Sequence, residues 1–341
     1  MSTPPRLELT REQILAFRRT TGALEGRLAP GAASLRRAAW VGLQDSMPRA
    51  ALLSLHARVE GILPDTWEDS ALIQVWGPRF SAYVIAADDR AVFTLGRLPD
   101  DAAGRRFAQE TADRLEDFLD GRRISYAEAG HGLGRNPNAL RYAAPTGRVL
   151  LRWEGARRPT IWTVSAPDMD PGEARLELAR RYLHIFGPTT AESFARWAGI
   201  PLARGRAAFA TLGSALLPVS TPVGDAWILA ADESAFGQPA AATAPARLLP
   251  SGDAYWLLKG RDRELLVPDA ARRAQLWAPR VWPGAVLIHG EIAGIWRRAA
   301  ANVTVETWRQ LSPAEREAVE AEAARLPLPD VHGQCRVRWV G

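Results

Sequence analysis

The sequence predicts an α+β protein made of three similar helical segments and a strand-rich C-terminal segment. Each of the three segments has about three helices followed by two short strands, although the repeats are too diverged to align by eye. Beyond residue 246 short strands predominate. Helices followed by a hairpin form a winged helix, so we expect three tandem winged-helix (helix-turn-helix plus β-hairpin) modules and then a small antiparallel β-barrel-like domain.

The first module is expected in residues 1–100. Thr10 and Gln13 have the spacing of a capping box, which predicts that a helix begins there. Apolar residues recur at helical spacing over about 34–43 and 48–60. The wing is expected at 71–76 and 80–86, joined by a turn at 77–79.

The second and third modules are expected in residues 101–170 and 171–240. In the second, a helix over 103–121 is followed by short helices near Tyr126 and over 137–144, and by strands at 148–153 and 160–164. In the third, helices are predicted over 173–186, 191–198 and from Pro201, and the strands over 215–220 and 226–230.

The C-terminal domain is expected at 246–341, after a loose linker at 237–246 rich in alanine and proline. Strands are predicted within 247–258, 263–268, 285–298 and 302–308, then a helix over 313–325 and a last strand at 335–340.

The composition is that of an ordinary globular protein of 341 residues, with 47% hydrophobic and 24% charged residues. The net charge is +5, and Lys259 is the single lysine. An arginine excess suits a nucleic-acid partner, although a GC-rich genome gives the same bias. The lone Cys335 excludes an internal disulfide and fits a reducing cytosol, and no apolar run is long enough to span a membrane. The N-terminus lacks the pattern of a signal peptide.

Known cofactor motifs are missing from the sequence, so we expect no cofactor. The five histidines have no metal-ligand spacing, which predicts no metal, and His184 is expected in the core. The glycines of 130–137 follow no strand and lack the Lys-Ser/Thr of a phosphate loop.

A polar tripeptide, Gln44-Asp45-Ser46, occupies a tight corner between the two helices at 34–43 and 48–60. Three further motifs follow in order: YLHIFGPTTAESFARWAGI at 182–200, LLPSGDAYW at 248–256 and GEIAGIW at 290–296. With this corner, they resemble the bacterial winged-helix DNA glycosylases that excise alkylated bases and unhook interstrand crosslinks. The resemblance spans roughly residues 10–325.

In that family the corner carries Gln, an apolar residue, and then Gln or Asp, facing the nucleoside. The resemblance implies that Gln44 holds the attacking water by its amide oxygen and that Asp45 or Ser46 supplies the second contact. Alternation of side chains puts Gln44 and Ser46 on one side and Asp45 on the other, which favours Ser46. If Asp45 instead points into the cleft, its carboxylate could be a general base. Either residue could also simply cap the following helix.

Substrate and DNA contacts are predicted elsewhere in the chain. Asp253, Tyr255 and Trp256 suit recognition of a cationic base by charge and stacking, while the alternative for Asp253 is a turn. DNA-phosphate contacts are predicted for paired arginines and for two that flank the corner, or these are ordinary surface residues. The arginines are Arg49, Arg58, Arg157, Arg158, Arg204, Arg206, Arg297 and Arg298.

Together these observations predict a monofunctional DNA glycosylase that hydrolyses the N-glycosidic bond of alkylated, cationic, bulky or crosslinked purines in duplex DNA. Only Lys259 could serve a Schiff-base lyase, and it is far from the corner in the sequence. The alternatives are a non-catalytic winged-helix DNA-binding protein, such as a regulator or lesion-shielding factor, and a protein-interaction scaffold. We expect duplex DNA as partner, no membrane, no obligate protein partner, and a cytoplasmic, nucleoid-associated location.

Overall fold

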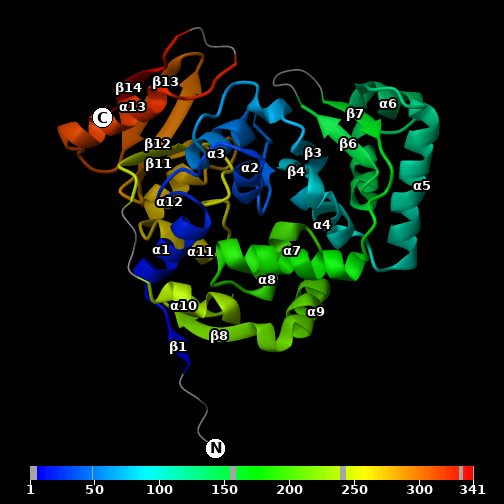
Figure 1. Ribbon diagram of the computed structural model, residues 1–341, viewed down its shortest axis with the longest axis horizontal. Coiled ribbons are helices and arrows are strands. Elements are labelled where there is room, and N and C mark those ends of the chain that lie inside the picture. Colours follow the sequence, from blue (N-terminus) through cyan, green and yellow to red (C-terminus); the bar gives the residue numbers. More distant parts are fainter. Residues whose placement is uncertain (1–5, 48, 154–158, 239–242, 330–332, 341) are drawn as a thin grey trace, which may run out of the picture.

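The computed structural model describes residues 6–47, 49–153, 159–238, 243–329 and 333–340 (Figure 1). These residues form a mixed α+β fold with three sheets, of three, five and six strands. The first segment lies in the middle of the molecule, and the second segment and the C-terminal sheet lie on opposite sides of it (Figure 1). No helix in these ranges is long and apolar enough to cross a membrane.

The first segment has the expected order of elements. Thr10 caps the first helix through the predicted capping box with Gln13. The elements are α1 (Arg11–Thr21), α2 (Ala32–Ala38), β2 (Leu43–Gln44), α3 (Ala50–Arg58), η1 (Thr66–Glu68), β3 (Leu72–Trp76), η2 (Pro78–Phe80), β4 (Ala82–Ala86), η3 (Ala87–Asp89), α4 (Arg90–Thr94) and η4 (Leu95–Arg97). The hairpin of β3 and β4 matches the predicted wing, and β2 extends it by pairing with β4.

The second segment shares a sheet with the first. Its elements are α5 (Ala102–Leu119), β5 (Ile124–Ser125), α6 (Tyr126–Gly132), the 3₁₀ helix η5 (Pro137–Thr146), β6 (Val149–Arg152) and β7 (Thr160–Thr163). Strand β6 pairs with β3 through Gln74 and Leu151, so the two hairpins form one six-stranded sheet in the order β2-β4-β3-β6-β7-β5. The tip between β6 and β7 lies outside the described residues.

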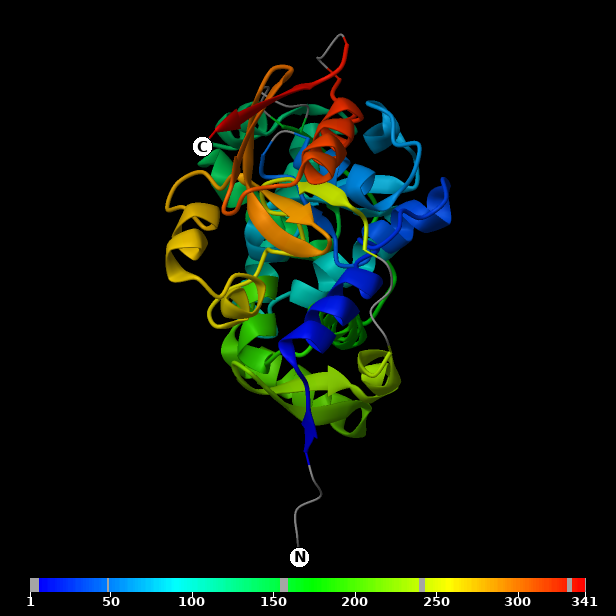
Figure 2. The same ribbon diagram turned by 90° about the vertical axis from the view of Figure 1, so that its left-hand side faces the viewer.

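The third segment also contains the expected elements, and the N-terminus joins it. Its elements are α7 (Pro171–Phe186), α8 (Ala191–Ala198), α9 (Leu202–Leu212), η6 (Gly213–Ala215), β8 (Leu216–Thr221), β9 (Gly224–Leu229), η7 (Ala230–Asp232) and α10 (Glu233–Phe236). Strand β1 (Leu7–Glu8) pairs in parallel with β8, which the sequence did not predict. Figure 2 shows β1 running down to this sheet, far from the C-terminal end.

The C-terminal segment differs from the predicted barrel. Its elements are β10 (Ala246–Leu249), α11 (Asp262–Leu266), α12 (Ala270–Leu276), β11 (Gly284–Ile288), β12 (Glu291–Ala299), β13 (Asn302–Thr307), α13 (Pro313–Ala324) and β14 (Arg336–Val340). In the described residues the five strands form an open sheet, and β13 and β14 pair in parallel. The sequence pattern suggested a small antiparallel barrel or a curled sheet, and the barrel is not confirmed. The strand expected at 263–268 is largely the helix α11, because Arg263 bonds back to Leu258 and the apolar Leu265 and Leu266 are buried.

The main hydrophobic core runs through all four segments. It joins Leu15 and Tyr83 to Tyr182, Trp256 and Ile295, with a cluster of tilted aromatic rings on α7 and α8. Smaller cores lie largely within the first, the second and the C-terminal segments. The division into modules remains a prediction, since the main core crosses its boundaries.

Candidate functional site

The corner between α2 and α3 holds Gln44 and Ser46 together. Pairing of β2 with β4 places Gln44 opposite Tyr83. The Gln44 Nε2 donates a hydrogen bond of 2.6 Å to Ser46 Oγ, and both residues are partly exposed. The two positions that the resemblance singled out therefore lie on the same side and touch each other.

Two neighbours orient the amide of Gln44. Arg79 Nη2 donates to Gln44 Oε1 at 3.0 Å, and the Tyr83 hydroxyl approaches the same oxygen at 3.4 Å. Burial raises the pKa of Tyr83, so the phenol stays protonated and acts as the donor. Arg79 itself donates from Nη1 to the carbonyl of Trp197 at 3.1 Å. Because donors face Oε1, the Nε2 must face Ser46.

Asp45 points the other way, into the protein. It is 3% exposed, and its Oδ1 accepts from the Ala51 backbone N–H at 3.0 Å while its Oδ2 accepts from Gln74 Nε2 at 2.9 Å. Burial raises its pKa to about 6. Asp45 thus accepts a hydrogen bond from a backbone N–H at the start of α3, which agrees with the alternative prediction that it caps this helix. Its carboxylate does not face the side on which Gln44 and Ser46 lie.

A cavity of about 250 Å³ opens beside Ser46. It lies where the first and second segments meet, and four of its ten described lining residues are aromatic. The lining residues are Ser46, Trp76, Phe80, Ser81, Ala82, Tyr126, Arg141, Leu151, Trp153 and Pro159. Beneath Phe80, the Arg97 guanidinium lies 4.8 Å from the ring, and burial lowers the pKa of Arg97 to about 10. This cavity can hold a planar group against aromatic rings, next to the hydroxyl of Ser46.

Comparison with known proteins decides the family. The family model described as "DNA glycosylase AlkZ-like" matches residues 35–327, which is most of the chain. The chain belongs to the AlkZ-like family.

Two proteins from Streptomyces sahachiroi are similar to this chain. A protein named "Interstrand DNA cross-link repair glycosylase" is 30% identical over 167 residues, which is 46% of this chain and 43% of that protein. The chain thus matches less than half of the length of this curated relative. The solved structure of the DNA glycosylase AlkZ is similar over 98% of this chain and all of the other, with a TM-score of 0.78 and 20% identity. At this identity the structural likeness concerns the fold alone.

The AlkZ-like chain buries the predicted base-recognition residues. Asp253 is 1% exposed and accepts two hydrogen bonds from Arg58, at 2.7 and 2.8 Å, and one from Ser54 Oγ at 2.7 Å. This saturated pair leaves neither Asp253 for a base nor Arg58 for a phosphate, and it corrects both expectations. Tyr255 and Trp256 are buried as well, and Trp256 packs against Trp277 and Trp282.

The predicted phosphate contacts are dispersed rather than gathered in one place. Arg204 is paired with Asp100 at 3.0 Å, and Arg206 with Glu192 at 2.9 Å. Arg49 lies 4.0 Å above the Trp67 ring, close to the corner. Arg297 and Arg298 are exposed on β12, while Arg157 and Arg158 lie outside the described residues.

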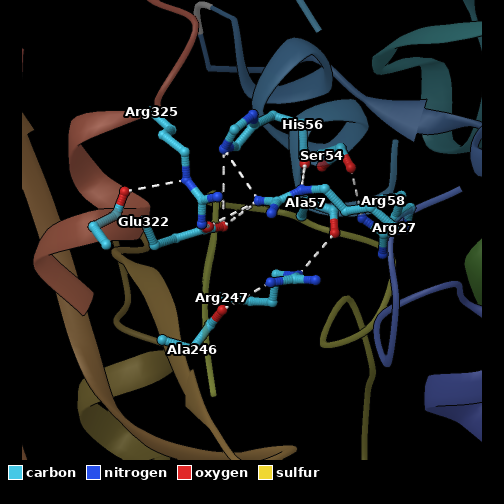
Figure 3. A network of polar contacts seen from close by, with 10 residues as sticks. Arg27, Ser54, His56, Ala57, Arg58, Ala246, Arg247, Glu322 and Arg325 are labelled. Carbon is cyan, nitrogen blue, oxygen red and sulfur yellow. Dashed lines mark hydrogen bonds and ion pairs between the residues drawn. The ribbon is translucent and has the colours of Figure 1, made fainter. Parts of the chain in front are cut away.

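A second polar network fixes the far end of α3 (Figure 3). Glu322 of α13 is 1% exposed and accepts from Arg27 Nη2 at 2.7 and 2.8 Å. Arg27 also donates to the carbonyl of His56, and Arg247 donates to that of Ala57. Burial lowers the pKa of His56 to about 4, so this ring is neutral near pH 7.

Several residues of the site were not predicted from the sequence. Arg79 belongs to the turn at 77–79, which looked purely structural, and Gln74 and Tyr83 lie within strands. Gln74 is a polar residue in an apolar strand, which was the one clue to a buried partner. Arg141 of the cavity wall gave no such clue. In the described ranges, no group of three or more His, Cys, Asp or Glu side chains could hold a metal ion.

Proposed function

We propose that this protein is a DNA glycosylase that hydrolyses the N-glycosidic bond of alkylated, cationic purines, including bulky or crosslinked ones, in duplex DNA. Its principal support is one observation: Gln44 is hydrogen-bonded to Ser46, and Ser46 lines a cavity together with four aromatic residues. Membership in the AlkZ-like family and the names of the two relatives favour the same function.

In the proposed reaction, the nucleotide leaves the base stack and its base enters the cavity. The bond between C1′ and the base nitrogen breaks, and its electron pair neutralises the cationic base. Water adds to C1′ of the sugar cation and then loses a proton to solvent. A cationic purine is a good leaving group, so positioning the water and the sugar is the main task for the protein.

Gln44 and Ser46 can share this task. Gln44 Oε1 is held by Arg79 at 3.0 Å, and a water bound to its second lone pair would replace the contact of 3.4 Å from the Tyr83 hydroxyl, which is long for a hydroxyl donor. Ser46 Oγ accepts from Gln44 and retains a second lone pair for the same water. Neither group is basic, which suits a reaction whose leaving group needs no protonation. Asp45 has a structural role in this scheme.

The cavity walls suit a base whose charge changes during the reaction. Aromatic faces such as those of Trp76, Phe80 and Trp153 attract a cationic ring. Among the described lining residues, Arg141 is the only charged one. It repels a cationic base before the bond breaks but not the neutral base that leaves, so its charge favours departure.

The DNA would bind along the three helical segments. We propose that each helix–hairpin unit acts as a winged helix, and that the protein acts in the cytoplasm on nucleoid DNA. In this proposal the partner is duplex DNA, and it is neither a membrane nor another protein.

The test is base release from duplex DNA carrying 7-methylguanine, with binding to the undamaged duplex measured in parallel. Release of 7-methylguanine under single-turnover conditions supports the enzyme. Binding without release from this or any other cationic purine favours the non-catalytic DNA-binding alternative, for which the serine at position 46 is the supporting feature.

Variants of the corner test the roles of the two side chains. Gln44→Ala should lower the single-turnover rate by on the order of 10²-fold while leaving DNA binding nearly unchanged, because positioning acts mainly in the transition state. Ser46→Ala should also slow release, and Ser46→Gln or Ser46→Asp, which restore family residues, should retain or raise it. Equal rates for wild type and Gln44→Ala would contradict the proposed role.

A further inference from the structure

Four cationic side chains gather on the side of Gln44 where the C-terminal segment meets α8. Arg79 donates to Gln44, and its backbone packs closely on Gly199, where an added Cβ would lie 2.9 Å from the Arg79 nitrogen. Arg196 lies in the last turn of α8, and a Cβ added to Gly260 would lie 3.9 Å from its Nη1. Lys259 precedes Gly260, and Arg263 donates to the carbonyl of Leu258 at 2.8 Å.

This cluster, defined as Arg79, Arg196, Lys259 and Arg263, is not neutralised by the protein. Within the described residues, none of the four side chains has an Asp or Glu partner within 4 Å. Arg204 and Arg206, by contrast, are both paired with carboxylates. Burial, with the charges of Arg79, Arg263 and Arg196, lowers the pKa of Lys259. Like charges held together in this way favour an anion between them.

We propose that this cluster binds a phosphodiester of the DNA strand, beside the nucleotide whose sugar faces Gln44. The inference rests on the proposed function for the location of that nucleotide. Arginine and lysine are the usual phosphate ligands in protein–DNA interfaces, and such contacts fix the register of the strand. Because Arg79 also orients the amide of Gln44, the phosphate and the water site share one guanidinium.

A backbone phosphate fits the cluster better than a base edge. The four side chains come from η2, from α8, from the loop before α11 and from the first turn of α11. All of them are hydrogen-bond donors, and none is an acceptor. Arg263 is additionally held over the Trp277 and Trp282 rings, at 4.8 and 5.4 Å, which limits its movement. A rigid cluster of donors with surplus charge recognises a phosphate, and does so whatever the sequence of the DNA.

The test is a chemical double-mutant cycle on binding. The probes are duplexes that carry a tetrahydrofuran abasic analogue, which the enzyme cannot hydrolyse. In each duplex one phosphate near the analogue is replaced by an uncharged methylphosphonate, at one of the three positions on either side. Wild type is compared with Lys259→Met and Arg196→Gln. The control is Arg106→Gln on α5, which removes one exposed charge that lies near Glu110.

Wild type should lose about tenfold or more in affinity at one methylphosphonate position, and the two cluster variants should lose little at that position. Each cluster variant should also reduce the slope of log affinity against log salt by about 0.9, and the control should not. Additive losses at every position, or an unchanged salt slope, would overturn the inference.

The single lysine offers a second readout that needs no variant. Acylation of Lys259 by an amine-reactive reagent, followed by peptide mass spectrometry, should be slowed several-fold by the abasic duplex and not by inorganic phosphate at the same phosphate concentration. Equal protection by free phosphate would mean that the cluster binds any phosphate and would overturn its assignment to a DNA position.

The failures of the two proposals are distinguishable. If wild type binds the abasic duplex with the expected coupling but releases no base, the glycosylase proposal fails and the cluster remains a phosphate site. If wild type releases base while the cluster variants bind and respond to salt as wild type does, only the cluster inference fails.

Discussion

Replacing Asp45 by Asn, with and without a compensating change at Gln74, separates a structural carboxylate from a catalytic one. In Asp45→Asn, the Oδ1 can still accept from Ala51, but an N–H₂ group replaces the oxygen that faces Gln74 Nε2. The amide of Gln74 cannot simply turn over, because its Oε1 accepts from the Trp153 N–H at 2.6 Å. Two donors then face each other at 2.9 Å or move apart, and the corner that carries Gln44 and Ser46 moves with them.

Two opposing terms determine the stability of Asp45→Asn. A pKa raised from 3.8 to about 6 means that ionised Asp45 costs the fold about 3 kcal/mol near pH 7. Loss of the charge-assisted bond and an unsatisfied buried donor cost about 2–4 kcal/mol together. The net change at pH 7 is therefore small. Because the folded pKa is raised, ionisation of Asp45 lowers the free energy of unfolding of wild type by about 3 kcal/mol as pH rises from about 4 through 6. Asp45→Asn lacks this loss, so its stability relative to wild type should increase over that range.

The double variant Asp45→Asn with Gln74→Glu restores all three hydrogen bonds, and only the bond between positions 45 and 74 reverses its direction. The new amide at position 45 would donate to the new carboxylate at position 74, which can also accept from the Trp153 N–H. We expect the single variant to lose about tenfold or more in the single-turnover rate of base release and the double variant to recover most of it. Urea unfolding between pH 4 and 7 checks the fold of each. A double variant that folds as wild type but stays inactive would refute a structural role and support Asp45 as the base.

Two further predictions concern the network at the far end of α3. Glu322→Gln leaves Arg27, Arg247 and Arg325 without their buried counter-charge. Urea unfolding at pH 7 should therefore show a free energy of unfolding that is lower by about 3–5 kcal/mol. A loss below about 1 kcal/mol would contradict this prediction. Because the folded pKa of His56 is lowered to about 4, its neutral ring contributes up to about 3 kcal/mol of stability that is lost as pH falls from 7 to 4, opposite in sign to the contribution of Asp45. In His56→Gln this loss should be absent, and parallel stability curves would show the prediction to be wrong.

Local patterns in the sequence were sufficient to predict most helices and hairpins. Capping residues and glycines define their own element ends, so α1, α5, α7 and α8 begin and end close to the expected residues. The joining of β3 to β6 and of β1 to β8 depends on contacts between distant segments, and no local pattern encodes these. The barrel is not confirmed for the same reason: the strands were largely located, but whether the sheet closes depends on pairing between its end strands.

The site was predicted in part. Alternation of side chains was enough to expect that Gln44 and Ser46 would face one way and Asp45 the other. The partners that orient them were beyond reach, because Arg79 and Tyr83 come from a turn and a strand that are 35 and 39 residues away from Gln44. The acidic motif residue Asp253 was attributed to base recognition, since a sequence does not reveal that Arg58 and Ser54 use its carboxylate.

The polar contacts along α3 support the proposed positioning of a water at the corner. Asp45 holds its first turn, Asp253 bonds to Ser54 in its middle and to Arg58 at its end, and Arg27 and Arg247 bond to carbonyls near its end. Residues of the first and the C-terminal segments therefore fix one short helix, and the strand β2 fixes Gln44 on its other side. Positional catalysis needs side chains held to within a fraction of an ångström, which an isolated loop does not provide. The buried carboxylates thus serve the proposed chemistry by holding the backbone that presents Gln44 and Ser46.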